Sequence, residues 1–136
     1  MWTPRSGWAL ALLALLFALL AIESTVKPFI ANPEISFVLL GRRTEGLLEA
    51  IAARIHALLM LAIAVGIWKQ RRFALALLMA YLPYVLLNRT LFFVRAGEEP
   101  AVALASPLFE ALFTVGALGV PAVSLLLLWR RRAELS

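Results

Sequence analysis

The sequence contains no cysteine and no aspartate, and His56 is its one histidine among 136 residues. Without cysteine the chain cannot form a disulfide, an iron–sulfur cluster, a thiolate zinc site or a cysteine nucleophile. The single histidine excludes haem ligation by two histidines of this chain, and the lack of aspartate excludes a Ser-His-Asp triad. Charged residues make up 15% of the chain, against about 25% in soluble domains. Many common enzyme classes are therefore ruled out.

Apolar residues are correspondingly abundant, at 63% of the chain, where a soluble domain has about 45–50%. They gather in four runs of about 18 to 23 residues, which as helices would be roughly 27–35 Å long and would cross a hydrocarbon core of about 30 Å. Lipid cannot satisfy backbone polar groups, so each run must be helical. We predict an all-α integral membrane protein with a single transmembrane domain over residues 1–136 and helices at about 8–25, 47–68, 73–93 and 107–129.

The links between these runs predict how the helices are connected. Only residues 69–72 separate the second and third runs, which forces an antiparallel pair and favours an up-down-up-down four-helix bundle. The link between the first two runs contains Pro28 and Pro33, which prevent a continuous helix. Its apolar residues 35–40 are too few to span, so we expect an irregular segment that lies at the membrane interface, dips shallowly into it or merely rests on lipid. Residues 95–100 are predicted to form a turn.

Basic residues flank the apolar runs and do not alternate with stacking aromatic residues, which argues against nucleic-acid binding despite a net charge of +5. Seven of them lie in the two terminal segments and the 69–72 link, and four lie in the other two links. By the positive-inside rule we expect both termini in the cytoplasm and the chain in the inner cell membrane. The first run has the length of a signal-peptide core, but no good cleavage site follows it, so we expect it to be retained.

Small residues suggest how two of the helices pack. In the first helix they recur at spacings of three and four, and they predict a face that packs closely on another helix, because small residues let backbones approach in lipid. In the fourth helix, Gly116, Gly119 and Pro121 predict a region of close contact and a kink. The stripe in the first helix consists of Gly7, Ala11, Ala14, Ala18 and Ala21.

Ionisable residues inside a membrane span are costly, so they usually face the bundle interior and mark a site or a pathway. Glu49 and His56 share a face of the second helix, and Tyr81, Tyr84 and Asn88 share a face of the third. We expect these faces to meet in the outer half of the membrane. The candidate catalytic residues, able to exchange a proton, are Glu49 and His56, and the candidate ligand-binding residues are Arg54, Tyr84, Asn88, Arg89 and Glu110.

Arg89 is expected to pair with Glu49 or Glu110, because a buried guanidinium needs a carboxylate. Each candidate also has a purely structural explanation. Glu49 and Glu110 could be acids in the first turns of helices, where the helix dipole favours a negative charge. Arg54 and Arg89 could extend to the lipid headgroups, and His56 could be a hydrogen-bonded packing residue.

A polar pocket beneath a half-apolar link suits an amphiphile with a polar head and a long tail, such as a lipid, a quinone or an isoprenoid. We therefore predict a small membrane protein that binds or acts on such a molecule. Whether it is an enzyme stays open, and the sequence specifies no cofactor. A metal site is not expected, because no Glu-x-x-His pattern occurs and the nearby arginines would repel a cation.

Two other functions stay open. The chain could be an accessory or structural subunit that packs against a membrane-protein partner. It could also be a small transporter that works as a homo-oligomer. Small multidrug-resistance transporters are four-helix chains of similar size that work as dimers, but they place an essential Glu in the middle of the first helix. Here the first helix is apolar until Glu23 at its end.

The layout of the chain resembles that of the small DoxX-like four-helix membrane proteins. An apolar first run is followed by a link with prolines, and Gly-Arg-Arg-Thr-Glu-Gly at residues 41–46 leads into the tightly linked second and third runs. The resemblance covers the layout and no specific motif. It implies a four-helix membrane fold, and no function or site residue is carried over from it.

Overall fold

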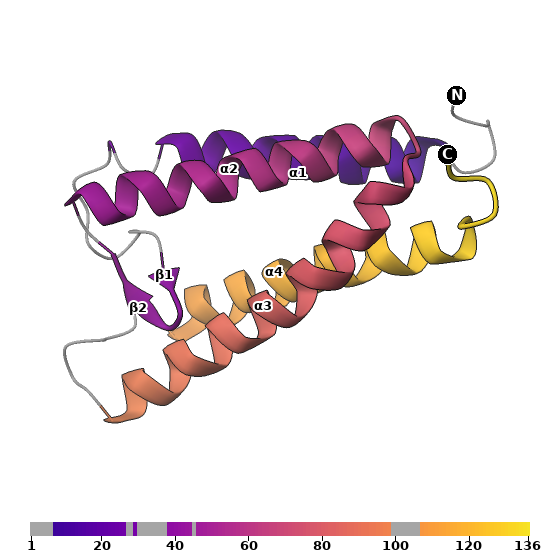
Figure 1. Ribbon diagram of the computed structural model, residues 1–136. Coiled ribbons are helices and arrows are strands. Elements are labelled where there is room, and N and C mark those ends of the chain that lie inside the picture. The colour runs from indigo at the N-terminus through magenta and orange to yellow at the C-terminus, as the bar shows by residue number, and fades with distance from the viewer. Residues whose placement is uncertain (1–6, 27–28, 30–37, 45, 99–106) are drawn as a thin grey trace.

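The computed structural model describes residues 7–26, 29, 38–44, 46–98 and 107–136. Four helices run alternately up and down in a bundle, with one small hairpin between the first two (Figure 1). Each helix is long and apolar enough to cross a membrane, so the chain is a multi-pass membrane protein and the predicted all-α bundle is confirmed. The elements are α1 (Gly7–Val26), β1 (Val38–Leu39), β2 (Arg42–Arg43), α2 (Gly46–Trp68), α3 (Arg72–Glu98) and α4 (Pro107–Arg130).

The two ends of the bundle differ in structure. One end holds the short turn at residues 69–71, and we call it the turn end; the other holds β1 and β2, and we call it the hairpin end (Figure 1). At the turn end, the Arg72 N–H donates to the Ser136 carbonyl (2.9 Å), and the Ser136 N–H donates to the Gln70 carbonyl (3.1 Å). Leu135 is buried beside them. The C-terminal tail therefore covers the turn between α2 and α3.

The three tryptophans among the described residues lie at the turn end, where α1 begins and where α2 and α4 end. Trp8, Trp68 and Trp129 are all exposed. An amphipathic indole ring is favoured at the boundary between lipid and water. Because all three lie at the same end of the bundle, we expect the turn end to lie at one boundary between lipid and water.

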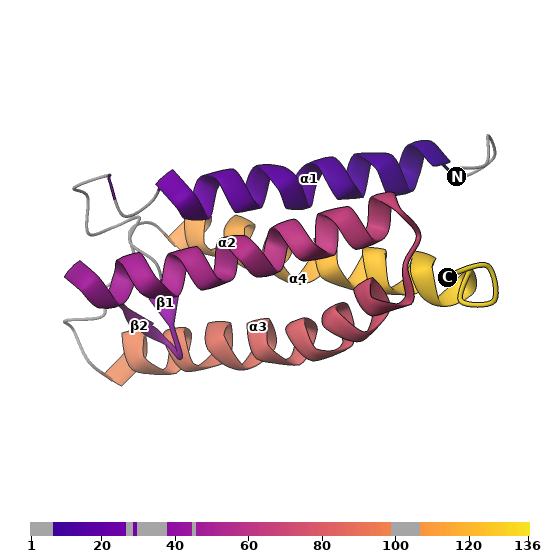
Figure 2. The same cartoon turned by 45° about the horizontal axis from the view of Figure 1, so that its top comes forward.

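The helix α1 packs along α2 and makes few contacts with α4 (Figure 2). Gly7, Ala14 and Ala21 of the predicted small-residue stripe are buried, and α2 presents small buried residues of its own, such as Ala53 and Ala57. Ala11 and Ala18 are only partly buried, and Leu10, Leu13 and Phe17 share the buried face, so the stripe is confirmed as a packing face in part. Small side chains on both helices let the two backbones approach, which is how van der Waals contact stabilises helix pairs in lipid.

The helices α2 and α3 meet closely at the turn end and separate toward the hairpin end (Figure 1). A Cβ built on Gly66 would lie 2.7 Å from the Cβ of Ala74, so only glycine fits where the two helices touch. The functional groups predicted from the sequence lie in the half of the bundle toward the hairpin end.

The predicted turn at residues 95–100 is wrong for residues 95–98, because α3 continues to Glu98 and does not end at Phe93. Gly97 alone does not stop a helix, whereas Pro100 disfavours helical backbone at the residue before it. The rest of that link, residues 99–106, lies outside the described residues. The end of α3 is therefore five residues farther from Arg89 than predicted, or about 8 Å at about 1.5 Å per residue.

The hairpin at residues 38–43 was not predicted. Val38 pairs with Arg43 and Leu39 pairs with Arg42 in an antiparallel arrangement. The central residues, Leu40 and Gly41, have φ values of 48° and 81°, as a type I′ turn requires. Leu-Gly is not the usual Asn-Gly or Asp-Gly signal for this turn, which is why the run appeared only as an apolar segment. Its residues 35–37, with the prolines before them, lie outside the described residues.

The predicted close contact at Gly116 and Gly119 is also wrong. A Cβ built on either glycine would meet no atom within 4 Å, because α4 stands apart from α1 here. Pro121 is buried within α4 and cannot donate a hydrogen bond to the Ala117 carbonyl, so this carbonyl lacks its usual partner in the helix. The glycines of α4 thus border open space.

Candidate functional site

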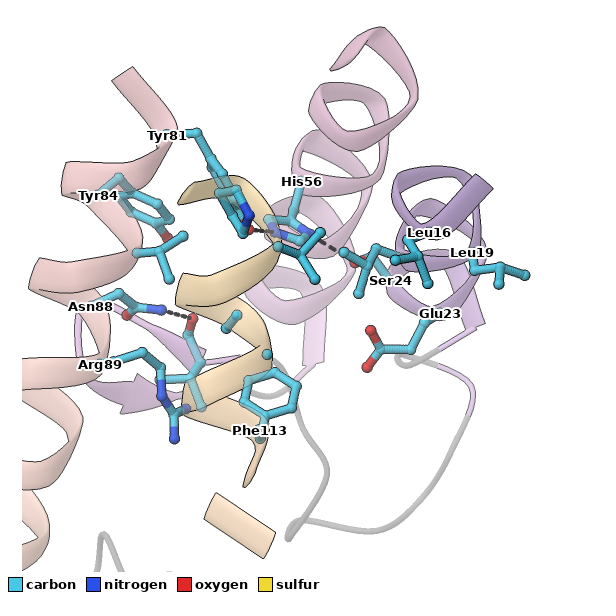
Figure 3. A pocket seen from close by; sticks show the side chains of 17 residues that line it. Leu16, Leu19, Glu23, Ser24, His56, Tyr81, Tyr84, Asn88, Arg89 and Phe113 are labelled. Carbon is cyan, nitrogen blue, oxygen red and sulfur yellow. Dashed lines mark hydrogen bonds between the residues drawn. The ribbon is translucent and has the colours of Figure 1, made fainter. Parts of the chain in front are cut away.

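A cavity of about 430 Å³ lies between α1, α3 and α4 in the half of the bundle toward the hairpin end (Figure 3). Among the described residues, α2 contributes only His56 to its wall and β1 only Val38. Small-molecule pockets typically measure roughly 300–1,000 Å³. The volume is therefore sufficient for a small ligand or for the head and first part of a longer one.

The walls of the cavity differ in polarity. The side formed by α1 and α4 is largely apolar and includes Leu16, Leu20 and Val120. The opposite side carries hydroxyl, imidazole, amide and guanidinium groups, mostly from α3. The cavity is thus amphipathic, and most of the wall opposite α3 comes from α1 and α4, whereas the sequence indicated a polar pocket between the second, third and fourth helices.

A chain of hydrogen bonds crosses three helices at the polar side. Oγ of Ser24 lies 2.7 Å from Nδ1 of His56, and Nε2 of His56 lies 2.8 Å from the hydroxyl oxygen of Tyr81 (Figure 3). A neutral imidazole has one N–H, so one of the two hydroxyls donates to the ring while the other accepts from it. Ser24 and Tyr81 are buried and His56 is half-buried. These hydrogen bonds join α1, α2 and α3 and place the His56 imidazole at the cavity wall.

Arg89 is buried on α3 and binds α4. Its Nη2 donates to Oε2 of Glu110 (2.6 Å), and its Nε donates to Oγ1 of Thr114 (3.1 Å). The Thr114 hydroxyl in turn donates to the Glu110 carbonyl (2.7 Å). Of the two predicted partners of Arg89, Glu110 is the one the structure shows, and extension of Arg89 to the headgroups is not what occurs.

Three aromatic rings surround the same guanidinium. Its central carbon lies 4.8 Å from the ring centre of Phe92, 5.3 Å from that of Phe93 and 5.1 Å from that of Phe113. Rings at these distances stabilise a cation through their negative faces. The charge of Arg89 is therefore balanced within the protein by Glu110 and by its aromatic surroundings.

Asn88 fastens the hairpin to α3. Its Oδ1 accepts from the Gly41 N–H (2.9 Å) and its Nδ2 donates to the Val38 carbonyl (3.1 Å). Gly41 is buried against α3, where an added Cβ would lie 2.6 Å from the carbonyl carbon of Leu91. The Asn88 amide is thus already bonded to backbone groups of the hairpin, and its main contribution is to hold Val38 at the cavity wall.

The structure brings four of the seven predicted site residues to the cavity: His56, Tyr84, Asn88 and Arg89. Glu110 does not line the cavity, and its bond to Arg89 links it to the cavity wall. Glu49 is buried but does not line the cavity, because it lies two helical turns, or about 10 Å, nearer the hairpin end than His56. Arg54 is exposed on α2, since a separation of two residues turns it about 160° away from His56.

Sequence reasoning missed the contribution of α1 to this site. Ser24 binds His56, and the Glu23 carboxylate is turned toward the cavity (Figure 3). Ser24 lies three residues after Ala21 and so continues the small-residue stripe onto the next turn. That spacing was the available signal that Ser24 faces α2. Within the described part of the chain, no group of three His or Glu side chains is placed to hold a metal ion.

No family model, no curated protein and no solved structure matches this chain. The DoxX-like layout therefore remains a resemblance in the sequence alone. The function has to be inferred from the cavity and the residues that line it.

Proposed function

We propose that the protein binds an amphiphilic small molecule, of lipid, isoprenoid or quinone type, in the cavity between α1, α3 and α4. The observation that carries this proposal is the division of one cavity into two sides. The polar side is formed mostly by α3, with His56 of α2 and Ser24 of α1, and the remaining wall on α1 and α4 is largely apolar. Pockets of this kind bury the apolar body of a ligand and orient it through a few polar groups. An amphiphile satisfies both sides at once.

We propose also that the turn end faces the cytoplasm and that the membrane is the inner cell membrane. Lys69, Arg71 and Arg72 lie at the turn end together with the basic residues that end α4. Basic residues accumulate on the cytoplasmic side of short loops. With this orientation the cavity lies in the outer half of the bilayer.

Binding is the part of the proposal that the geometry supports most directly. If a reaction follows binding, His56 is the side chain placed to exchange a proton with the bound head, because it lies at the cavity wall between two hydroxyl groups. The Ser24 and Tyr81 hydroxyls would orient the ring. The proposal of binding does not depend on such a reaction.

Native mass spectrometry of protein extracted in a mild detergent tests the proposal. We expect a stoichiometric adduct on the unchanged protein. Ala117→Phe fills the cavity from its wall, whereas Ala122→Phe places the same ring on the exposed side of α4. The adduct should fall at least about tenfold with Ala117→Phe, a loss of about 1.4 kcal/mol in binding, and should be unchanged with Ala122→Phe.

The proposal fails if the unchanged protein carries no adduct after incubation with membrane lipid extract, or if Ala117→Phe retains it fully. An accessory subunit would instead fail to accumulate alone, or would accumulate with a second protein in the same spectrum. The masses therefore separate the binding protein from that alternative.

A further inference from the structure

We infer that the cavity selects an uncharged head group, a hydroxyl or a carbonyl, and that the tail of the ligand leaves between α1 and α4 into the surrounding lipid. This inference rests on the proposed function and names the class of ligand and its position. The charges at the cavity wall, the available hydrogen-bonding groups and the exposed residues at the rim each support it.

The charges at the wall disfavour an anionic head such as a phosphate. Among the described lining residues, Glu23 and Arg89 carry formal charges. The Arg89 guanidinium lies at the cavity wall, but it is bonded to Glu110 and Thr114 and flanked by three rings, so an anion would have to compete with the buried Glu110 carboxylate for it. Glu23 would repel the anion as well.

The same charges disfavour a cationic head at the polar side. Glu23 is exposed at the rim, whereas Arg89 is buried within the wall. Among the described lining residues, the deep part of the cavity offers a cation no carboxylate, and the nearby Glu110 carboxylate is already bonded to Arg89. Burying a charge without a partner is costly. The deep part of the site is therefore suited to a head group without charge.

Hydrogen-bonding groups for such a head are present. The Tyr84 hydroxyl makes no hydrogen bond with any described residue, and the Tyr84 side chain lies on the cavity wall beside Tyr81 (Figure 3). A phenolic hydroxyl can donate to a carbonyl or exchange hydrogen bonds with a hydroxyl. On the α4 side, Pro121 leaves the Ala117 carbonyl without its helical donor, and both residues line the cavity. A ligand hydroxyl could donate to that carbonyl.

The rim shows where the tail leaves. Leu19 on α1 is 51% exposed and Gly116 on α4 is exposed, yet both also line the cavity. These two helices make few contacts, whereas the tight packing of α1 on α2 closes the neighbouring side. Because both helices span the membrane, the surface between them faces lipid tails. The opening is therefore lateral and suits an aliphatic chain.

A photolabelling competition in phosphatidylcholine nanodiscs tests both the preference for an uncharged head group and the exit of the tail between α1 and α4. The probe is hexadecanol with a diazirine in the middle of its chain, and the competitors are plain hexadecanol, hexadecyl phosphate and hexadecyltrimethylammonium. We expect hexadecanol to compete at a concentration at least about tenfold lower than either charged analogue, equivalent to about 1.4 kcal/mol. Competed label should lie on α1 and α4, near Leu19 and Val120.

Matched variants separate the site from the general lipid surface. Gly116→Leu places a side chain at the rim, whereas Gly119→Leu adds the same side chain one turn away at a position outside the lining, and both positions have free space for a Cβ. We expect competed labelling to fall about tenfold with Gly116→Leu and to be unchanged with Gly119→Leu. Tyr84→Phe should weaken competition by hexadecanol without changing the helix content.

The outcomes distinguish this inference from the proposed function. Stronger competition by either charged analogue, or competed label confined to α2 and α3, overturns the inference and leaves a binding cavity in place. Equal labelling of the two glycine variants overturns the lateral opening. If no competitor displaces the probe and native mass spectrometry also shows no adduct, the proposed function fails together with the inference.

Discussion

The guanidinium of Arg89 and the carboxylate of Glu110 lie 2.6 Å apart and join the interior of α3 to the first turn of α4. Their side chains are only 5% and 4% exposed. The Thr114 hydroxyl bonds to the Arg89 side chain and to the Glu110 carbonyl, so the contact is a small network across two helices. Each buried charge depends on the other, because neither has water to replace its partner.

Loss of one member of this pair should cost more than loss of both. We expect Arg89→Met alone to lower the free energy of unfolding by about 3–5 kcal/mol, because it leaves a buried carboxylate without its partner. The double variant Arg89→Met with Glu110→Met should be more stable than the single variant. Thermal unfolding in one detergent, followed by circular dichroism, measures both. Arg54→Met, on the exposed side of α2, serves as the control. If the changes in unfolding free energy caused by Arg89→Met and Glu110→Met simply added in the double variant, Arg89 and Glu110 would not be a coupled pair.

Gly41 should be required for attachment of the hairpin to α3. Gly41→Ala introduces a Cβ that would lie 2.6 Å from backbone and side-chain atoms of Leu91, at a φ of 81°. Gly46→Ala tests the backbone strain alone, because Gly46 also has a positive φ but nothing within 4 Å. Hydrogen exchange measured by mass spectrometry should show faster exchange at residues 38–43 in Gly41→Ala only. Equal exchange in both variants would mean that the close approach to α3 does not hold the hairpin.

The single histidine makes the hydrogen-bond chain directly measurable. In protein labelled with ¹⁵N-histidine, the two ring nitrogens of His56 give one signal each, and their shifts report hydrogen bonding. We expect Ser24→Ala to move chiefly the Nδ1 signal and Tyr81→Phe to move chiefly the Nε2 signal, because each removes one partner. Thr25→Val is the control, since the Thr25 hydroxyl donates to the Ala21 carbonyl and not to the ring. If the ¹⁵N shifts of His56 were unchanged in Ser24→Ala and Tyr81→Phe, the hydrogen bonds from Ser24 through His56 to Tyr81 would be contradicted.

The absence of native cysteine allows the orientation to be tested with single introduced cysteines. Leu47→Cys lies at the hairpin end, where Leu47 is 76% exposed, and Lys69→Cys lies in the exposed turn between α2 and α3. In intact cells a membrane-impermeant maleimide should label Leu47→Cys, and it should label Lys69→Cys only after the membrane is opened. The reverse pattern would place the termini on the outer side.

The membrane-spanning helices and the packing face of α1 were predictable because they depend on local properties of the chain. A run of apolar residues of sufficient length must form a helix in lipid, whatever its neighbours are. The spacing of Gly7, Ala14 and Ala21 places them on one side of α1, and this side packs on α2. The end of α3 was predicted less well, because the residues after Phe93 are polar enough to leave the membrane and still continue the helix.

The candidate site was predictable only in part. Helical phase indicates which residues share a face, and Tyr81, Tyr84 and Asn88, which it grouped, line the cavity together. Arg54 was a candidate ligand-binding residue, but it is exposed on α2 and does not line the cavity. Phase does not indicate which helix that face meets. Both Glu49 and Glu110 were therefore acceptable partners for Arg89, and the position of α4 beside α3 selects Glu110.

The order of residues alone determines the number of spans, their approximate limits and the scarcity of polar groups within them, since each is a property of consecutive residues. The tertiary structure decides that α1 supplies Ser24 to His56 and that Asn88 holds the hairpin on α3. It also decides that the cavity is lined mainly by α1, α3 and α4. These contacts join residues far apart in the chain, and they exist only once the helices have packed against each other.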